Sequence, residues 1–453
     1  MRPTDQQLQS LIDAEVTRFR EENPGSWACF QEARGPLLEG VPMPWMTEWA
    51  SPYPLFVERA EGAAFWNVDG REYVDFCLGD TGAMAGHAAA PVARAVAAQA
   101  AAGITMMLPT ADAAAVGEEL TRRFGVSHWQ FSLTATDANR FVMRLARRIT
   151  GRPKVLVFNW CYHGSADETL AVLDGDAVVE RPQSIGPPVD PALTTKVVEW
   201  NDVAALERAL ADEDVACVLA EPALTNIGIV PPDPGFHDAL RELTRRHGTL
   251  LVIDETHTIC CGPGGYTGAH GLKPDAVTIG KTIAGGVPAA AYGMGAEMVE
   301  RMGELSFLRG SDVGGVGGTL AGNALSLAAI RTTLDEVLTD EAFVGMTALA
   351  ERFEAGVADV IAAHDAPWHV TRLGCRAEYW FCRERPRNGG EAAAAVDPLL
   401  DRYFHLYLLN RGILMTPFHN MALMCPATTA AQVDRHTEVF AEAVERLASE
   451  AGR

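Results

Sequence analysis

Lys281 is the residue of this 453-residue chain whose surroundings point most directly to chemistry. It follows the apolar segment 276–279, precedes the paired glycines Gly285 and Gly286, and is one of only four lysines. A lysine amine can condense with a carbonyl, which an arginine cannot do because its guanidinium stays protonated. We therefore predict that Lys281 forms a Schiff base with a cofactor aldehyde. Its local sequence alone would equally suit a lysine in a solvated loop.

Other polar residues follow the apolar segments that read as buried strands. Asn159 to Gly164 follow 155–158, Glu221 follows 215–220, and Asp254 and Glu255 follow 249–253. In an open parallel sheet, ligands bind at the carboxyl ends of the strands. We therefore expect these side chains to share one cleft with Lys281.

This set of residues suits pyridoxal 5'-phosphate. That cofactor needs a lysine for its aldehyde and a carboxylate that keeps its ring nitrogen protonated, and Asp254 would fill the second role. Its phosphate needs a cradle such as the start of a helix, and Thr134–Asp137 opens the predicted helix 137–149. Asp254 could instead cap the next element, and Thr and Asp are ordinary helix N-caps.

An α/β scaffold is needed to position these residues. From about 112 to 330, unbroken apolar runs alternate with segments of helical period, which predicts a mostly parallel sheet with helices on both sides. We predict an N-terminal segment (1–70) that contributes to a small domain and a substrate loop, a large cofactor-binding domain (71–330), and a C-terminal small α+β domain (331–453).

The N-terminal segment carries its own structural signals. Thr4 and Gln7 resemble a capping box for an amphipathic helix over 4–22. Residues 26–54 read as an irregular loop, and 55–77 as a β-meander.

Composition argues against several classes of partner. The net charge of −22 disfavours nucleic acid and anionic membranes. No apolar run reaches about eighteen residues, and the first residues lack the apolar core of a signal sequence, so we expect a cytoplasmic protein without a membrane span. The nine cysteines include no CxxC pair, and no metal site is expected.

Motifs along nearly the whole chain resemble those of the class III aminotransferases, near the branches of glutamate-1-semialdehyde aminomutase and of the β-amino acid and ω-amine transaminases. These motifs are, in chain order, Thr134–Asn139, Tyr162–Gly164, Glu221–Pro222, Asp254–Thr256, Gly280–Lys281, Gly285–Pro288 and Gly318–Asn323.

The resemblance implies an α/β enzyme of the fold type I class, with a large mostly parallel-sheet domain, a smaller α+β domain and pyridoxal 5'-phosphate as cofactor. Lys281 would be its catalytic lysine, and Thr319 would reach the phosphate bound by the other subunit of a homodimer. The residues implied to bind the cofactor are Ala135, Thr136, Tyr162, His163, Glu221, Asp254, Thr256, His257, Lys281 and Thr319.

Three cofactor positions depart from the family pattern. Ala135 replaces the usual glycine of the phosphate turn, and Thr256 replaces an apolar residue beneath the ring. His257 falls where relatives place a residue near the cofactor's phenolic oxygen. It could tune the imine or simply pack beside it.

Three substrate positions are also singled out. β-Amino acid relatives hold carboxylates with arginines at positions that match Trp45 and Phe418 here, which favours a bulky or aromatic substrate. Arg376 could supply a replacement cation, and simple packing is the alternative for the two aromatic residues.

We therefore expect a ping-pong aminotransferase that moves an amino group between a small-molecule amine or amino acid and a keto acid. Lys281 would move the proton as general base and then acid. The alternatives are a 2,1-aminomutase of the glutamate-1-semialdehyde type, a decarboxylase on the same scaffold, or a non-catalytic pyridoxal-phosphate-binding protein.

Overall fold

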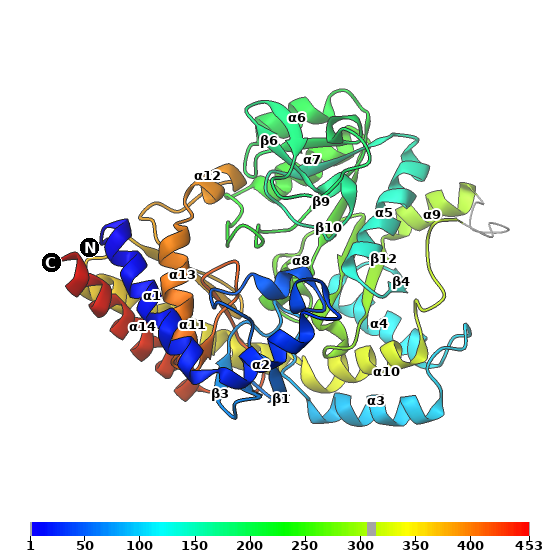
Figure 1. Ribbon diagram of the computed structural model, residues 1–453. Coiled ribbons are helices and arrows are strands. Elements are labelled where there is room, and N and C mark those ends of the chain that lie inside the picture. The colour runs from blue at the N-terminus through cyan, green and yellow to red at the C-terminus, as the bar shows by residue number, and fades with distance from the viewer. Residues whose placement is uncertain (1, 306–313, 453) are drawn as a thin grey trace. The chain divides into compact units, whose positions relative to one another are not determined.

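The computed structural model describes residues 2–305 and 314–452, which fall into two compact units (Figure 1). Unit 1 combines the described parts of 1–89, 344–385 and 395–453. Unit 2 combines the described parts of 90–343 with 386–394. Within the described residues, no helix is long and apolar enough to cross a membrane.

Unit 2 is built on a seven-stranded sheet in which every neighbouring pair is parallel except those made by one strand, β12. The strands in spatial order are β4 (His128–Ser132), β12 (Ala290–Met294), β11 (Ala276–Ile279), β10 (Leu250–Asp254), β9 (Val215–Ala220), β5 (Lys154–Phe158) and β8 (Thr195–Val198). Every residue of β9 and β10 is buried, which explains their unbroken apolar sequences. The predicted α/β fold with a mostly parallel sheet is confirmed.

Helices and a small hairpin pack around this sheet. The helices are α3 (Ala90–Ala102), α4 (Asp112–Phe124), α5 (Ala135–Thr150), α6 (Val203–Leu210), α7 (Phe236–Arg246), α8 (Gly265–His270), α9 (Ala296–Leu305), α10 (Ala324–Thr332) and α12 (Gly389–Ala394), and the hairpin is β6 (Ala171–Asp174) with β7 (Ala177–Glu180). Figure 1 shows α5 running along β12 and β4, and its inner face is apolar and buried. Gly151, with φ 70°, ends α5 in the left-handed conformation that glycine adopts without strain.

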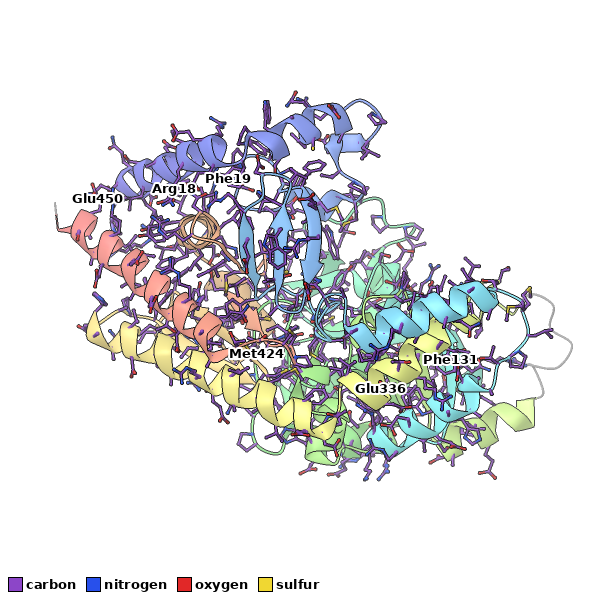
Figure 2. All side chains as sticks on the ribbon, turned by 90° about the horizontal axis from the view of Figure 1, so that it is seen from below. Arg18, Phe19, Phe131, Glu336, Met424 and Glu450 are labelled. Carbon is purple, nitrogen blue, oxygen red and sulfur yellow. The ribbon has the colours of Figure 1, made fainter. Side chains whose placement is uncertain are left out.

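Unit 1 holds two small sheets and the long helices. One sheet orders β1 (Val57–Glu61), β2 (Ala64–Asn67), β3 (Glu72–Asp75) and β15 (Ile413–Leu414), and the other orders β13 (His369–Leu373), β14 (Arg376–Trp380) and β16 (Met421–Leu423). The helices are α1 (Asp5–Glu22), α2 (Pro24–Ala33), α11 (Asp340–Ala363), α13 (Pro398–Leu409) and α14 (Ala430–Ala451). Helix α13 packs against α1 and α14, and Phe19 of α1 is fully buried (Figure 2).

The N-terminal helix begins as predicted, but the segment after it does not follow the prediction. Thr4 and Gln7 form the capping box of α1. The expected irregular loop is wrong for 26–33, because Pro24 opens a second helix at its first turn, a position that tolerates proline. The carboxylate of Asp69 accepts hydrogen bonds from the backbone N–H of Gly25, at 2.5 Å, and of Ser26, at 3.1 Å. The helix is therefore capped from a distant turn, which the local sequence does not reveal.

Arg123 offers a test of the packing in unit 2. Its side chain is only 2% exposed and pairs with Glu119 at 2.6 Å. It also donates to the carbonyl oxygens of Leu334, at 2.7 Å, and Leu338, at 3.0 Å. We expect Arg123→Met to lower the free energy of unfolding by about 3 kcal/mol, because it leaves buried carbonyls without donors.

Its neighbour provides the control. Arg122 binds the same glutamate but its side chain is 57% exposed, so Arg122→Met should change stability by less than about 0.5 kcal/mol. Urea unfolding followed by circular dichroism compares the two variants, and equal losses would contradict this account of Arg123.

Candidate active site

Asp254, the last residue of β10, lies at the centre of a buried polar network in unit 2. Its Oδ2 is 2.9 Å from Nδ1 of His163 and accepts a hydrogen bond from the Asn139 amide at 2.8 Å. Its Oδ1 accepts from the backbone N–H of Thr256 at 3.0 Å. Asn139 in turn accepts from the Thr278 hydroxyl at 2.6 Å. The network therefore joins the carboxyl ends of β5, β10 and β11 to the first turns of α5.

The charges in this network are set by its contacts. Burial alone would raise the pKa of Asp254, but the hydrogen bond and charge of His163, with the donors Thr256 and Asn139, lower that pKa to about 2. Burial opposes the charged form of His163, yet Cys161 and Asp254 raise its pKa well above the ordinary value. Asp254 is therefore a carboxylate at neutral pH, as the protonation of a pyridine nitrogen requires.

Lys281 stands at the end of β11 in a conformation that few residues adopt. Its φ is 51°, in the left-handed region, which costs a non-glycine residue about 1 kcal/mol and persists only where the surroundings enforce it. Its Nζ lies 2.7 Å from Nε2 of His257. The structure thus brings together the predicted lysine and the predicted histidine.

The first turn of α5 has the free backbone N–H groups that the predicted phosphate cradle needs. The first bond of this helix runs from the N–H of Ala138 to the carbonyl of Thr134, so the N–H groups of Ala135 and Thr136 precede it and can face an anion. Gly280 approaches so closely that a Cβ there would lie 3.0 Å from the methyl of Ala135. The alanine in place of the family's glycine is thus accommodated by the glycine before Lys281.

Gly164 closes the other side of the cradle. Its φ is 85°, and a Cβ at this position would clash with the hydroxyl of Thr136. The backbone N–H of Ser165 also donates to that hydroxyl at 3.2 Å. The segment after β5, which contains Tyr162 and His163, is therefore fixed against the start of α5.

Two further predicted residues lie in the same unit and are buried. Glu221 accepts from the backbone N–H of Thr225 at 3.0 Å and from its hydroxyl, while burial raises the pKa of its carboxyl. The hydroxyl of Thr256 is buried and has no hydrogen-bond partner among the described residues. An unsatisfied buried hydroxyl two residues after Asp254 fits a bound polar group.

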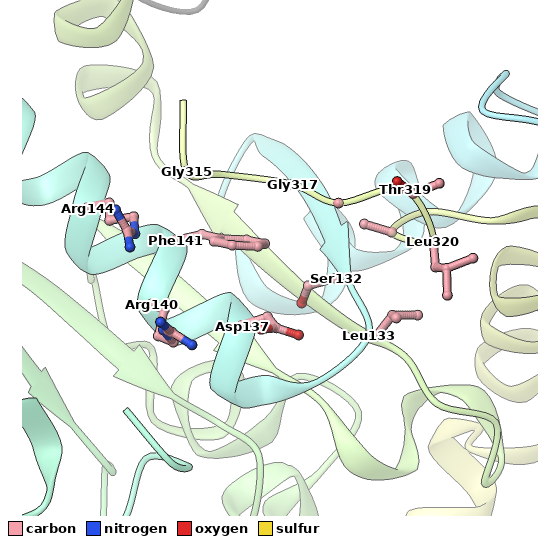
Figure 3. A pocket seen from close by; sticks show the side chains of 12 residues that line it. Ser132, Leu133, Asp137, Arg140, Phe141, Arg144, Gly315, Gly317, Thr319 and Leu320 are labelled. Atoms are coloured by element: carbon pink, nitrogen blue, oxygen red, sulfur yellow. The ribbon is translucent and has the colours of Figure 1, made fainter. Parts of the chain in front are cut away.

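Thr319 lies apart from this network, at a cavity of about 430 Å³ (Figure 3). Asp137 and Phe141 of α5 line the same cavity, and Thr319 itself is exposed. Its role toward a partner's cofactor stays a prediction.

The three predicted substrate residues all belong to unit 1. Trp45 and Phe418 meet edge to face with ring centroids 5.9 Å apart, and each remains close to half exposed. Arg376 is 1% exposed in β14 and donates to the hydroxyl of Thr81. The structure thus brings the two aromatic residues together.

Two residues that contact the predicted site were not singled out from the sequence. Asn139 ends one of the quoted motifs, and its position one helical turn after the cradle could have placed it on the buried face of α5. Arg181 follows the hairpin β6–β7 and reaches back to the carbonyl of Cys161. No motif signals this second residue.

The residues present fit pyridoxal phosphate. The carboxylate of Asp254 suits a protonated ring nitrogen, the start of α5 suits a phosphate, and Lys281 suits an aldehyde. Thr256 offers a further donor.

Comparisons with known proteins agree with this fit. The family Aminotransferase class-III matches residues 45–444. Glutamate-1-semialdehyde 2,1-aminomutase of Neisseria gonorrhoeae is 34% identical over 406 residues, which cover 87% of this chain and 92% of that one. The sequence-based resemblance is confirmed.

Solved structures extend the comparison. A glutamate-1-semialdehyde-aminomutase from Pseudomonas aeruginosa PAO1 is 50% identical, with a TM-score of 0.96 over 99% of this chain and 100% of that one. A lysine-to-alanine variant of it was crystallised in complex with PMP. An omega-transaminase from Sphaerobacter thermophilus is 29% identical, with a TM-score of 0.85 over 95% of this chain and 99% of that one. Pyridoxal 5'-phosphate as the cofactor is confirmed.

The contact between His257 and Lys281 can be tested on the cofactor-free protein. We expect His257→Leu to slow covalent attachment of pyridoxal phosphate to Lys281 about tenfold, because the hydrogen-bond partner that orients the amine is lost. His257→Gln keeps a side chain that can donate or accept a hydrogen bond and should restore most of the rate. Visible absorption after rapid mixing measures attachment, and borohydride reduction followed by mass spectrometry locates it. Equal rates for the leucine variant and the unaltered protein would refute the orienting role.

Proposed function

This chain belongs to the class-III aminotransferase family, and on that premise we propose that it is a 2,1-aminomutase acting on glutamate-1-semialdehyde. The observation that carries the proposal is the 50% identity, over 99% of the chain, to the aminomutase from Pseudomonas aeruginosa PAO1. The reaction is an isomerisation. The amino group moves from the carbon beside the aldehyde to the aldehyde carbon, and the product is 5-amino-4-oxopentanoate.

This proposal replaces the transamination expected from the sequence. Transfer between a bulky or aromatic amine and a keto acid is overturned by the aminomutases at 50% and 34% identity. The expectation rested on Trp45 and Phe418 in place of arginines. Two aromatic positions do not exclude a carboxylate, because an arginine elsewhere in the fold can bind it.

Each cofactor-site residue has a proposed part. When bound, pyridoxal phosphate in its aldehyde or amine form carries the amino group and delocalises the electron pair left when a carbon loses a proton. Asp254, held by His163 and Asn139, would bind its ring nitrogen, and the start of α5 would bind its phosphate. Tyr162 would cover the ring.

Lys281 would move the proton. Its amine takes the proton from one carbon of the substrate and returns a proton at the neighbouring carbon, as general base and then acid. Nε2 of His257 lies 2.7 Å from that amine, within hydrogen-bond distance, and would hold it in place. Because the product is an isomer of the substrate, no keto acid is consumed.

A homodimer is proposed as well. Loop 104–108 of unit 2 exposes Ile104, Met106, Met107 and Leu108, the last two by 76% and 72%. The carbonyl of Ile104 accepts from the N–H of Ala324 at 3.0 Å, so this loop lies beside the segment that contains Thr319. Exposed apolar side chains gathered on one face favour an interface with a second copy.

The function is tested by isomerisation without a co-substrate. Purified protein loaded with the cofactor should convert glutamate-1-semialdehyde to 5-amino-4-oxopentanoate, followed by NMR, with no keto acid added. Lys281→Ala should lower the rate by about a thousandfold or more, because the proton carrier is gone. Lys273→Ala, at an exposed lysine, is the matched control. Turnover that begins only when a keto acid is supplied would refute the aminomutase.

The dimer is tested by sedimentation. The unaltered protein should sediment as a dimer. In the double variant Met107→Glu with Leu108→Glu, the dimer dissociation constant should rise at least about tenfold, because two charges per subunit would be buried at the contact. Ile185→Glu changes an isoleucine that is 96% exposed in another loop and should not alter assembly. A monomer at every concentration would contradict the proposal.

A further inference from the structure

Arg181 is held at the base of the hairpin β6–β7 in unit 2. Its backbone N–H donates to the carbonyl of Leu170 at 2.9 Å, directly after the last strand pair, Ala171 with Glu180. The hairpin is tied to the sheet by the side chain of Asn159, which accepts from the N–H of Leu173 at 2.9 Å. The backbone that carries Arg181 is therefore fixed relative to the end of β5.

The guanidinium of Arg181 turns back over the segment that follows β5. Nη1 donates to the carbonyl of Cys161, and the guanidinium carbon lies 5.4 Å from the ring centroid of Trp160. Tyr162 is the next residue along, and His163 after it binds Asp254. The guanidinium thus binds the same segment after β5 that carries Tyr162 and His163.

This guanidinium has no carboxylate partner among the described residues, although it is partly buried. Other shielded arginines of unit 2 are paired, such as Arg123 with Glu119 at 2.6 Å and Arg241 with Asp275 at 2.8 Å. Apart from the bond to the Cys161 carbonyl, the side chain of Arg181 donates to no other group among the described residues, which leaves N–H groups for a ligand. A partly buried charge without a carboxylate partner is destabilising, and an anionic ligand would offset that cost.

The groups around Arg181 also affect its pKa. Burial lowers the pKa of Arg181, while Cys161, Glu221 and Tyr162 act in the opposite direction. Two of the three groups that raise the pKa of Arg181, Glu221 and Tyr162, are thus predicted cofactor-site residues.

We propose that Arg181 binds the carboxylate of the substrate, with the N–H groups that the Cys161 carbonyl leaves open. The inference rests on the proposed function, whose substrate carries one carboxylate at the end remote from the reacting carbons. A guanidinium fits a carboxylate with paired hydrogen bonds. Arg181 then replaces the arginines that are absent at Trp45 and Phe418, and Arg376 is the competing candidate.

Binding of unreactive probes to the cofactor-loaded protein tests the proposal. Pentanoate has the carboxylate and chain length of the substrate, and pentanamide lacks the charge. By calorimetry, Arg181→Gln should raise the Kd for pentanoate about 30-fold and leave that for pentanamide unchanged. Arg181→Lys should bind pentanoate with intermediate affinity. Arg246→Gln, at an exposed arginine 50% accessible, is the matched control.

Arg376→Gln is measured beside these variants. If it loses pentanoate and Arg181→Gln does not, the inference is overturned. Arg181→Lys retains the positive charge and so separates loss of the guanidinium from loss of charge. Circular dichroism and cofactor attachment at Lys281 show whether each variant is folded. If the unaltered protein does not isomerise glutamate-1-semialdehyde, the proposed function fails. If it isomerises the substrate and Arg181→Gln binds pentanoate normally, only the role of Arg181 fails.

Discussion

The buried ion pair between Asp254 and His163 is the interaction on which the rest of the site depends. A carboxylate deep in an apolar sheet stays charged only while it is paired and hydrogen-bonded, and here an imidazole, an amide and a backbone N–H share that task. Each donor comes from a different stretch of unit 2. The requirement to keep one carboxylate ionised therefore fixes how β5, β10 and α5 meet.

Close backbone approaches follow from the same requirement. Gly164 and Gly280 stand where a side chain would strike the first turn of α5, and Lys281 accepts a left-handed backbone directly after Gly280. The lysine thus follows β11 on a turn with a left-handed backbone, and His257 lies within hydrogen-bond distance of its amine. Such a conformation persists only where the surrounding packing enforces it.

The substrate half shows why residue types at two positions are a weak guide to function. Trp45 and Phe418 contact each other, so part of their apolar surface serves that contact rather than a ligand. Arg181, directly after the hairpin β6–β7, forms no salt bridge among the described residues, although the charge of Glu221 acts on it. In the proposed enzyme, carboxylate binding would fall to this arginine while the cofactor network stays the same.

The sequence by itself determined the α/β class, the alternating elements of unit 2 and the lysine, aspartate and helix start that fit the cofactor. It could do so because buried parallel strands are continuous apolar runs and their polar ends share one edge. It missed α2, whose N–H groups are capped by Asp69 from a distant turn, and it missed Asn139 and Arg181. Only the tertiary structure decided these, because a hydrogen bond between residues far apart in the chain leaves no periodic signal in either local sequence.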